Sequence, residues 1–248
     1  KIMEKMSSTR LNQFDDLIQM CTASNMYLGW GNPNAQVLFV GKEAALNEKP
    51  DWYVKQINDL KEYAYGRKDI NFKRYKQDDS HIFISAHTWS KYQKLHDFIF
   101  PNIKRETDVM NFEENIFVTE MNDNSAKRTN EAQKRINFKA DVEKRKSLFF
   151  TRSYIKSFSV IVLACSGYIR NYGEENETRE IDNIFAVKYK YSFQTKTTKK
   201  PQSFHVHLSD DGKRLVIHTN QLSGSAASKE LLEKLGKVIK THLDSKII

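Results

Sequence analysis

The sequence predicts an α/β fold, in which helices cover both faces of a mainly parallel sheet. Apolar runs at 36–41, 115–120 and 159–165 are continuous rather than alternating. Such runs are typical of parallel strands that are buried on both faces. The segments between them carry apolar residues at the spacing of amphipathic helices. Strands that alternate with helices in this way indicate a layered α/β domain.

The amino-terminal half begins with a helix, because Leu11, Phe14 and Leu17 recur at helical spacing. Turn-forming residues then end this helix before the first apolar run. We expect a helix over 10–23, a turn over 29–34, a strand over 36–41, helices over 52–66 and 88–100, and a basic surface segment over 67–80.

The carboxyl-terminal half contains a strong hairpin signal at Asp210-Asp211-Gly212. Ser228 suits the N-cap of a last helix. We expect strands over 115–120 and 159–165, a basic and largely helical segment up to 157, an exposed strand over 184–193, and hairpin strands over 203–208 and 213–219.

Composition limits the class of protein. Apolar residues make up 39% and charged residues 29% of the 248 residues, which is typical of a globular chain, and we expect a single domain over 1–248. Forty Lys and Arg against 31 Asp and Glu favour polyanionic partners, nucleic acid first. Two cysteines, no long apolar run and no signal-peptide core at the amino end lead us to expect a cytoplasmic monomer without a membrane partner.

Glu43 follows the first strand, two residues after Gly41. Ligands of α/β sheets bind beyond the carboxyl ends of the strands, and glycine lets the backbone approach a ligand closely. A carboxylate there can orient water, act as a general base or stabilise a cationic transition state. The structural alternative is a Glu43 that begins or caps a solvated helix.

His218 ends the last strand, before a loop of small polar residues that leads into a helix. Free backbone N–H groups and small side chains in such a loop suit a phosphate backbone, with Gln221, Ser223 and Ser225 as candidate contacts. A hydrogen-bonded core histidine is the alternative interpretation.

A zinc site is a second possible use of His218. A two-residue turn at Asp211-Gly212 pairs His205 with His218 and puts His207 on the same face, whereas a three-residue turn separates them. Three imidazoles suit zinc, but no carboxylate completes the set. The main expectation is therefore no metal and no cofactor.

A basic segment between 122 and 152 contains nine Lys or Arg residues. It is either a set of solvated helix faces or a surface that follows nucleic-acid phosphates, with Lys127 and Arg128 as candidate contacts. Tyr189 and Tyr191 are candidate aromatic contacts beside this surface, or else an ordinary strand face.

The two strand-end motifs resemble those of the uracil-DNA glycosylase superfamily. Gly41-Lys42-Glu43 corresponds to the superfamily's Gly-x-Asp-Pro motif, and the segment from His218 to Ser223 keeps the His, Leu and Ser of His-Pro-Ser-x-Leu-Ser. The order of elements is also similar over most of the chain. The resemblance implies a three-layer α/β/α sandwich with a mainly parallel central four-stranded sheet. The iron–sulfur subfamilies are excluded, because their four cysteines are absent.

The resemblance also implies roles for individual residues. Glu43 would act on the water or the sugar cation, His218 would stabilise the charge of the departing base, and the loop over 221–225 would hold the DNA backbone. Glu120 stands where the superfamily has its base-recognising Asn, and Asn122 is a second candidate for base recognition. An ionised Glu only accepts hydrogen bonds, so a base with an amino group suits Glu120 better than uracil.

The sequence therefore predicts a DNA glycosylase-like hydrolase that cleaves the N-glycosidic bond of a modified or damaged base, as in DNA repair. Its expected partner is nucleic acid, DNA first. Ala44, Thr219 and Gln221 replace prolines of the two motifs, which favours the alternative of a non-catalytic nucleic-acid-binding relative. A zinc-dependent hydrolase built on the three histidines is the weaker alternative.

Overall fold

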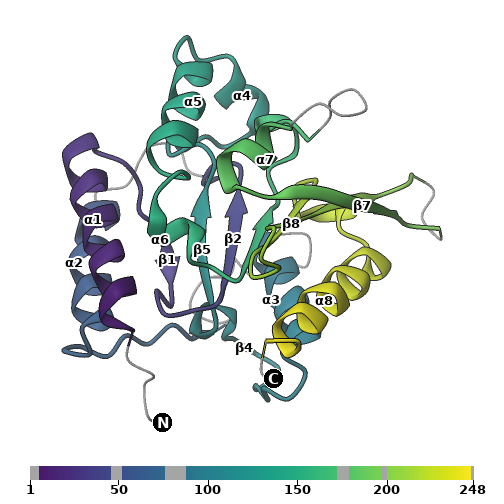
Figure 1. Ribbon diagram of the computed structural model, residues 1–248, viewed down its shortest axis with the longest axis horizontal. Coiled ribbons are helices and arrows are strands. Elements are labelled where there is room, and N and C mark those ends of the chain that lie inside the picture. Colours follow the sequence, from purple (N-terminus) through teal and green to yellow (C-terminus); the bar gives the residue numbers. More distant parts are fainter. Residues whose placement is uncertain (1–5, 46–51, 76–87, 172–178, 197–199, 247–248) are drawn as a thin grey trace.

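A mixed seven-stranded sheet forms the centre of the computed structural model, which describes residues 6–45, 52–75, 88–171, 179–196 and 200–246. The strand order is β1-β5-β2-β6-β9-β8-β7 (Figure 1). The α/β class is confirmed, but the sheet is larger than the expected four strands. The strands are β1 (Trp30–Gly31), β2 (Val37–Gly41), β5 (Ile116–Glu120), β6 (Val160–Leu163), β7 (Lys188–Gln194), β8 (Ser203–Leu208) and β9 (Leu215–Thr219).

Four neighbouring strands of this sheet, β5, β2, β6 and β9, are parallel to one another. The remaining strands extend the sheet in antiparallel fashion, β1 beside β5 at one end and β8 and β7 beyond β9 at the other. A separate two-stranded sheet pairs β3 (Arg74–Tyr75) with β4 (Val109–Met110).

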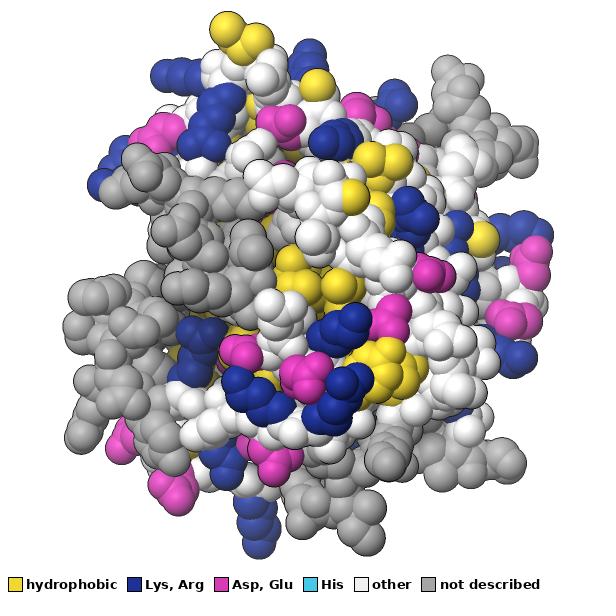
Figure 2. All heavy atoms as spheres, turned by 90° about the vertical axis from the view of Figure 1, so that its left-hand side faces the viewer, with side chains coloured by type: hydrophobic (Ala, Val, Ile, Leu, Met, Phe, Trp, Pro, Cys, Tyr) yellow, Lys and Arg dark blue, Asp and Glu magenta, His cyan; other side chains and the backbone are white. Residues whose placement is uncertain are grey.

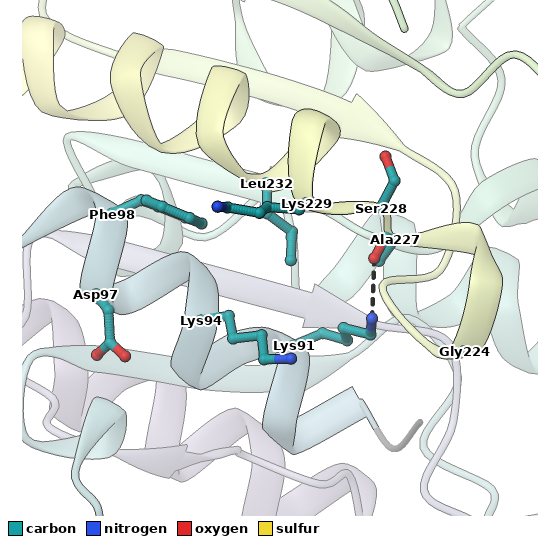
Figure 3. A pocket seen from close by; sticks show the side chains of 9 residues that line it. All are labelled: Lys91, Lys94, Asp97, Phe98, Gly224, Ala227, Ser228, Lys229 and Leu232. Carbon is teal, nitrogen blue, oxygen red and sulfur yellow. Dashed lines mark hydrogen bonds between the residues drawn. The ribbon is translucent and has the colours of Figure 1, made fainter. Parts of the chain in front are cut away.

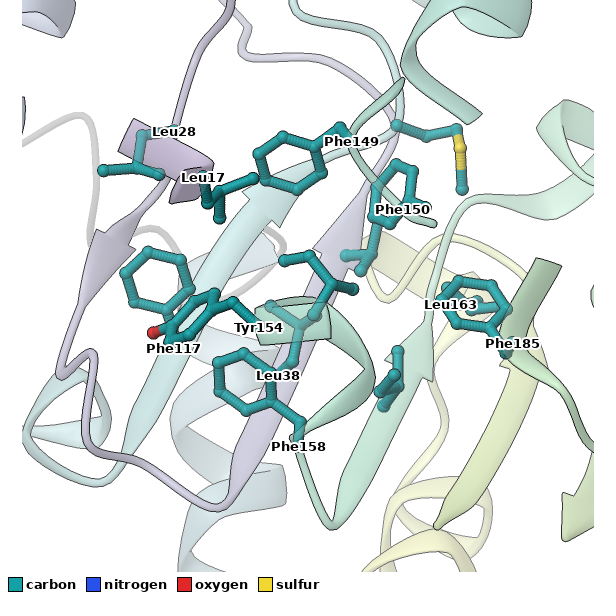
Figure 4. Packing of buried hydrophobic residues seen from close by; sticks show 14 of the residues in the cluster. Leu17, Leu28, Leu38, Phe117, Phe149, Phe150, Tyr154, Phe158, Leu163 and Phe185 are labelled. Carbon is teal, nitrogen blue, oxygen red and sulfur yellow. The ribbon is translucent and has the colours of Figure 1, made fainter. Parts of the chain in front are cut away.

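Helices cover both faces of the large sheet, because alternate residues of its strands enter two different hydrophobic clusters. Leu38 and Val40 of β2 pack in one cluster, whereas Val37 and Phe39 pack in the other. Figure 4 shows part of the first cluster, where rings from the segment around Phe150 and Tyr154 meet the sheet.

The first cluster includes residues of α1 (Ser8–Ser24), α2 (Trp52–Ala64), α5 (Phe138–Leu148), α6 (Ser153–Lys156) and α7 (Glu180–Phe185). The second includes residues of α3 (Thr88–Ile99) and α8 (Lys229–Asp244). The short helices are α4 (Thr129–Gln133) and the 3₁₀ turns η1 (Phe112–Glu114), η2 (Ser166–Tyr168) and η3 (Gly224–Ala226).

Local sequence sets the ends of the two long helices. Ser7 caps α1, and Ser228 caps α8 as expected, its hydroxyl accepting from the N–H of Leu231 at 3.2 Å. Asn25 ends α1 in the left-handed region with φ 51°, a conformation that asparagine adopts more readily than most residues.

The predicted exposed strand over 184–193 is correct only in its second part. Residues up to Phe185 belong to α7, because Ile181 and Phe185, four residues apart, are both buried against the core. Ala186 then reverses the chain with φ 51°, and β7 starts at Lys188. The surface segment expected over 67–80 contains β3, and its part beyond 75 lies outside the described residues.

Two further observations concern the surface. On the face formed by α1 and α2, acidic and basic side chains are interspersed (Figure 2), and Lys61 pairs with Asp15 and Lys68 with Asp59 there. None of the described helices is both long and apolar enough to cross a membrane.

Candidate active site

The candidate residues lie at one edge of the sheet. Because β2, β5, β6 and β9 are parallel, their carboxyl ends meet at the same edge. Glu43 follows β2, Glu120 ends β5, η2 follows β6, and His218 lies at the end of β9.

Glu120 and Gly41 are in direct contact across the β2–β5 ladder. They are register partners, and a Cβ atom built on Gly41 would lie 2.1 Å from Oε2 of Glu120. A side chain at position 41 would therefore require the Glu120 carboxyl group to move. Gly41 therefore serves Glu120 as well as the turn towards Glu43.

Glu43 is held by two hydroxyl groups. Its Oε1 accepts a hydrogen bond from Oγ1 of Thr129 at 3.0 Å, and its Oε2 accepts one from the Tyr168 hydroxyl. Burial and the Glu43 carboxylate raise the pKa of Tyr168, so the phenol stays protonated and donates. Each oxygen of Glu43 keeps a lone pair for a further donor.

Glu120 is protonated at neutral pH. Burial and the nearby Glu43 carboxylate raise its pKa from 4.5 to about 8, although Arg145 opposes the shift. A protonated carboxyl group both donates and accepts, as an amide does. The raised pKa favours the neutral acid, so this environment does not support the preference for a base with an amino group, which assumed an ionised Glu120.

Arg145 is fully buried and makes its hydrogen bonds to the last two residues of β5. Its Nε donates to the carbonyl of Glu120 at 2.5 Å and its Nη2 to Oγ1 of Thr119 at 2.6 Å. The guanidinium lies 3.9 Å from the ring centre of Phe149. Arg145 and the buried Lys146, which pairs with Glu143 and Glu180, are thus not part of a nucleic-acid surface, contrary to the interpretation of the whole basic segment.

His218 is fixed by η2. Its Nε2 lies 2.8 Å from the carbonyl oxygen of Ser166, so Nε2 carries the proton. Nδ1 is buried and has no hydrogen-bond partner among the described residues. Burial, with smaller effects of His205 and His207, lowers the pKa of His218 to about 4. The ring is neutral at pH 7, and its one N–H faces Ser166.

The three histidines share a face as the hairpin parity predicted, since His205 pairs with His218. Their nitrogens have other partners: His205 contacts Ser192 at 2.6 Å, and His207 lies 2.6 Å from Asp182. Within the described ranges, no group of three His, Cys, Asp or Glu side chains is arranged to hold a metal. The observed contacts do not support the zinc alternative.

The other predicted residues are placed differently. Asn122 is buried, and its Oδ1 accepts from the N–H of Asn124 at 3.1 Å, so its side chain shapes a turn. Gln221 donates its backbone N–H to Oγ of Ser166 at 3.1 Å, and Ser223 precedes η3. The side chain of Ser225 lies outside the described set. Lys127 and Arg128 are exposed next to α4.

Ser166, Tyr168 and Thr129 are site residues that sequence reasoning missed. The backbone of Ser166 has φ 50°, an unfavourable conformation for serine, and it aims the carbonyl at His218 and the hydroxyl at the following loop. The sequence signal was Gly167 directly after an apolar strand, which marked a turn but not its contacts.

Comparisons with family models, with curated proteins and with solved structures found no match to this chain. The site is therefore interpreted from its own geometry.

Proposed function

We propose that the chain is a DNA glycosylase-like hydrolase, which cleaves the N-glycosidic bond of a base in nucleic acid. The observation that carries the proposal is the position of η2, which contacts Glu43 through Tyr168 and His218 through Ser166. This turn joins the two predicted catalytic residues at one edge, with Glu120 beside Glu43. The parallel strands β5, β2, β6 and β9 agree with the fold that the resemblance implies.

Glu43 suits the reacting sugar. Two hydroxyl donors fix its orientation, and its free lone pairs can accept from an attacking water or lie against a developing sugar cation. Glu120 suits the base: as a protonated acid it can donate to a base oxygen or nitrogen and accept from a base N–H. Glu120 as a neutral acid beside Glu43 as a carboxylate acceptor suits N-glycosidic hydrolysis, in which a base leaves and water attacks the sugar.

His218 needs a rearrangement to take part. Its N–H must exchange the Ser166 carbonyl for the departing base, because neutral imidazole has a single donor. In the proposed reaction, entry of the base displaces this hydrogen bond.

The test is a panel of single- and double-stranded oligonucleotides, each with one modified base, incubated with the wild-type chain and with Glu43→Gln. We expect cleavage of at least one substrate and a loss of about 100-fold or more in Glu43→Gln, the range of acid–base or electrostatic catalysis. Glu62→Gln is the matched control, since Glu62 is a partly exposed carboxylate on α2 that pairs with Arg67. No product with any base, or equal rates for Glu43→Gln and wild type, would sink the proposal.

The second candidate is a nucleic-acid-binding protein without turnover. The bond between His218 and Ser166 favours it, because it leaves no free imidazole donor for a departing base. This candidate predicts binding of oligonucleotides that weakens linearly in log affinity against log salt, with no product. The cytoplasmic location and the monomeric state stay predictions from the sequence.

A further inference from the structure

A cavity of about 590 Å³ lies between α3 and the amino-terminal end of α8. Figure 3 shows side chains of α3 on one side and the turn before α8 on the other. The loop that leaves His218 passes through η3 and forms part of the wall. The lining residues are Lys91, Lys94, Asp97, Phe98, Gly224, Ala227, Ser228, Lys229 and Leu232.

The lining carries an excess of positive charge. Among the described lining residues, Lys91, Lys94 and Lys229 are the cations and Asp97 is the one carboxylate. Asp97 is already engaged, with Nη2 of Arg105 at 2.9 Å and Nε2 of Gln93 at 2.7 Å. Lys229 pairs with Glu233 at 3.4 Å. The lysines of the wall without an acidic partner among the described residues are therefore Lys91 and Lys94.

Lys91 and Lys94 repel each other across one turn of α3. Burial and the charge of Lys94 lower the pKa of Lys91. Nζ of Lys91 donates to the carbonyl of Ala227 at 3.0 Å, while Lys94 is exposed and has no acidic partner within the described part of the chain. An anion between the two ammonium groups would relieve this repulsion.

The remaining walls indicate the kind of anion. Phe98 and Leu232 supply apolar surface, and the first turn of α8 adds the positive end of a helix dipole to the lysines. A pocket of several hundred Å³ with apolar walls and a few convergent polar groups is typical of sites for small organic ligands. The lining thus suits a phosphate joined to an apolar, ring-containing body.

We propose that this cavity binds a nucleotide through its phosphate group. Lys91 and Lys94 contact the phosphate, and Phe98 and Leu232 contact the sugar or base. The nucleotide is either free or part of a strand that continues from the candidate active site through the loop before α8. The inference needs no hydrolysis at Glu43 and stands apart from the proposed function.

The test uses calorimetric titration of the wild-type chain with adenosine 5′-monophosphate, with uncharged adenosine and with an unmodified single-stranded oligonucleotide. We expect the affinity for a phosphate-bearing probe to fall about tenfold or more in Lys94→Gln, since a charged hydrogen bond is lost. Lys68→Gln, an exposed lysine that pairs with Asp59, is the control and should bind as the wild type does.

Each outcome decides the matter. Binding of the monophosphate that Lys94→Gln weakens supports a free nucleotide. Binding of the oligonucleotide alone, weakened by Lys94→Gln and not by Lys68→Gln, supports the phosphate of a strand. Equal affinities in both variants, adenosine binding as well as its monophosphate, or no binding of any probe would overturn the proposal. Because no bond is cleaved in these titrations, a failure here is separate from a failure of the hydrolase assay.

Discussion

The acidic side and the imidazole side of the sheet edge differ in how their polar groups are used. On the acidic side, at the ends of β2 and β5, Glu43 keeps free lone pairs and Glu120 has no hydrogen bond to its carboxyl group among the described residues. On the imidazole side, His218 at the end of β9 and His207 in the neighbouring antiparallel β8 are bonded to the protein itself. The acidic side thus keeps polar groups that a ligand could contact, whereas those of the imidazole side hold the hairpin in place.

Burial acts on the two sides with opposite consequences for charge. It raises the pKa of Glu120 and lowers the pKa of His218, so both groups are neutral at pH 7. The two sides therefore respond to pH in opposite directions, and this contrast can be tested by substitutions on each side.

The largest effect on stability is expected for Arg145→Ala, which removes the hydrogen bonds between Arg145 and the end of β5. Two hydrogen bonds of a fully buried guanidinium are lost and a cavity remains, so the free energy of unfolding should fall by about 3 kcal/mol. Urea unfolding measures this fall. Arg145→Met, which fills more of the space, should lose less, and the exposed Arg128→Ala should change stability by less than about 0.5 kcal/mol. Equal losses in Arg145→Ala and Arg128→Ala would contradict the buried role.

Glu120→Gln should change how stability depends on pH on the alkaline side. Folded Glu120 keeps its proton up to about pH 8, whereas the unfolded chain releases it near 4.5, so wild-type stability falls as pH rises between these values. Glutamine removes this loss. Relative to wild type, the variant should gain about 2 kcal/mol in unfolding free energy between pH 5 and pH 8, a value reduced for partial exposure. A constant difference between the two proteins at both pH values would refute the raised pKa.

His218→Gln should act in the opposite window. Folded His218 stays neutral down to about pH 4, whereas the unfolded chain takes up a proton near 6.5, so wild-type stability falls as pH decreases through this range. The variant should therefore gain about 1 kcal/mol relative to wild type between pH 7 and pH 5. Urea unfolding at both pH values provides the measurement, and a gain on the alkaline side instead would remove the contrast between the two sides.

The smallest effect on folding is expected for the double variant Lys127→Gln, Arg128→Gln. Both side chains are exposed, so stability should change by less than about 0.5 kcal/mol. If they contact phosphates, the slope of log affinity for an oligonucleotide against log salt should decrease by about 2. Lys68→Gln, whose lysine pairs with Asp59 on α2, should leave the slope unchanged. An unchanged slope in the double variant would remove both residues from the interface.

The sequence predicted those elements whose residues are all buried or are capped by a nearby residue. The strands ending at Gly41 and Glu120 were found because every position of β2, and every position of β5 but the last, is buried. The α8 cap was found because Ser228 acts on a donor three residues away. Both signals come from residues that are close together in the sequence, so the sequence alone is enough to detect them.

Contacts between distant segments were not predictable in the same way. Arg145 looked like a solvated cation in a basic run, and only the packing of Phe149 and the carbonyl of Glu120 make it a core residue. Likewise, nothing local to Ser166 indicates that its carbonyl meets a histidine 52 positions later. Glu120 was predicted as a site residue, but its protonation depends on burial that the sequence does not display.

The contact between Gly41 and Glu120 affects which residues related sequences can carry at these two positions. A side chain at 41 and a carboxyl group at 120 compete for the same space. In related sequences, a side chain at 41 should therefore accompany either a smaller residue at 120 or a glutamate whose carboxyl group lies in another position. A glycine kept at 41 would thus mark the sequences in which the carboxyl group at 120 stays beside the end of β2.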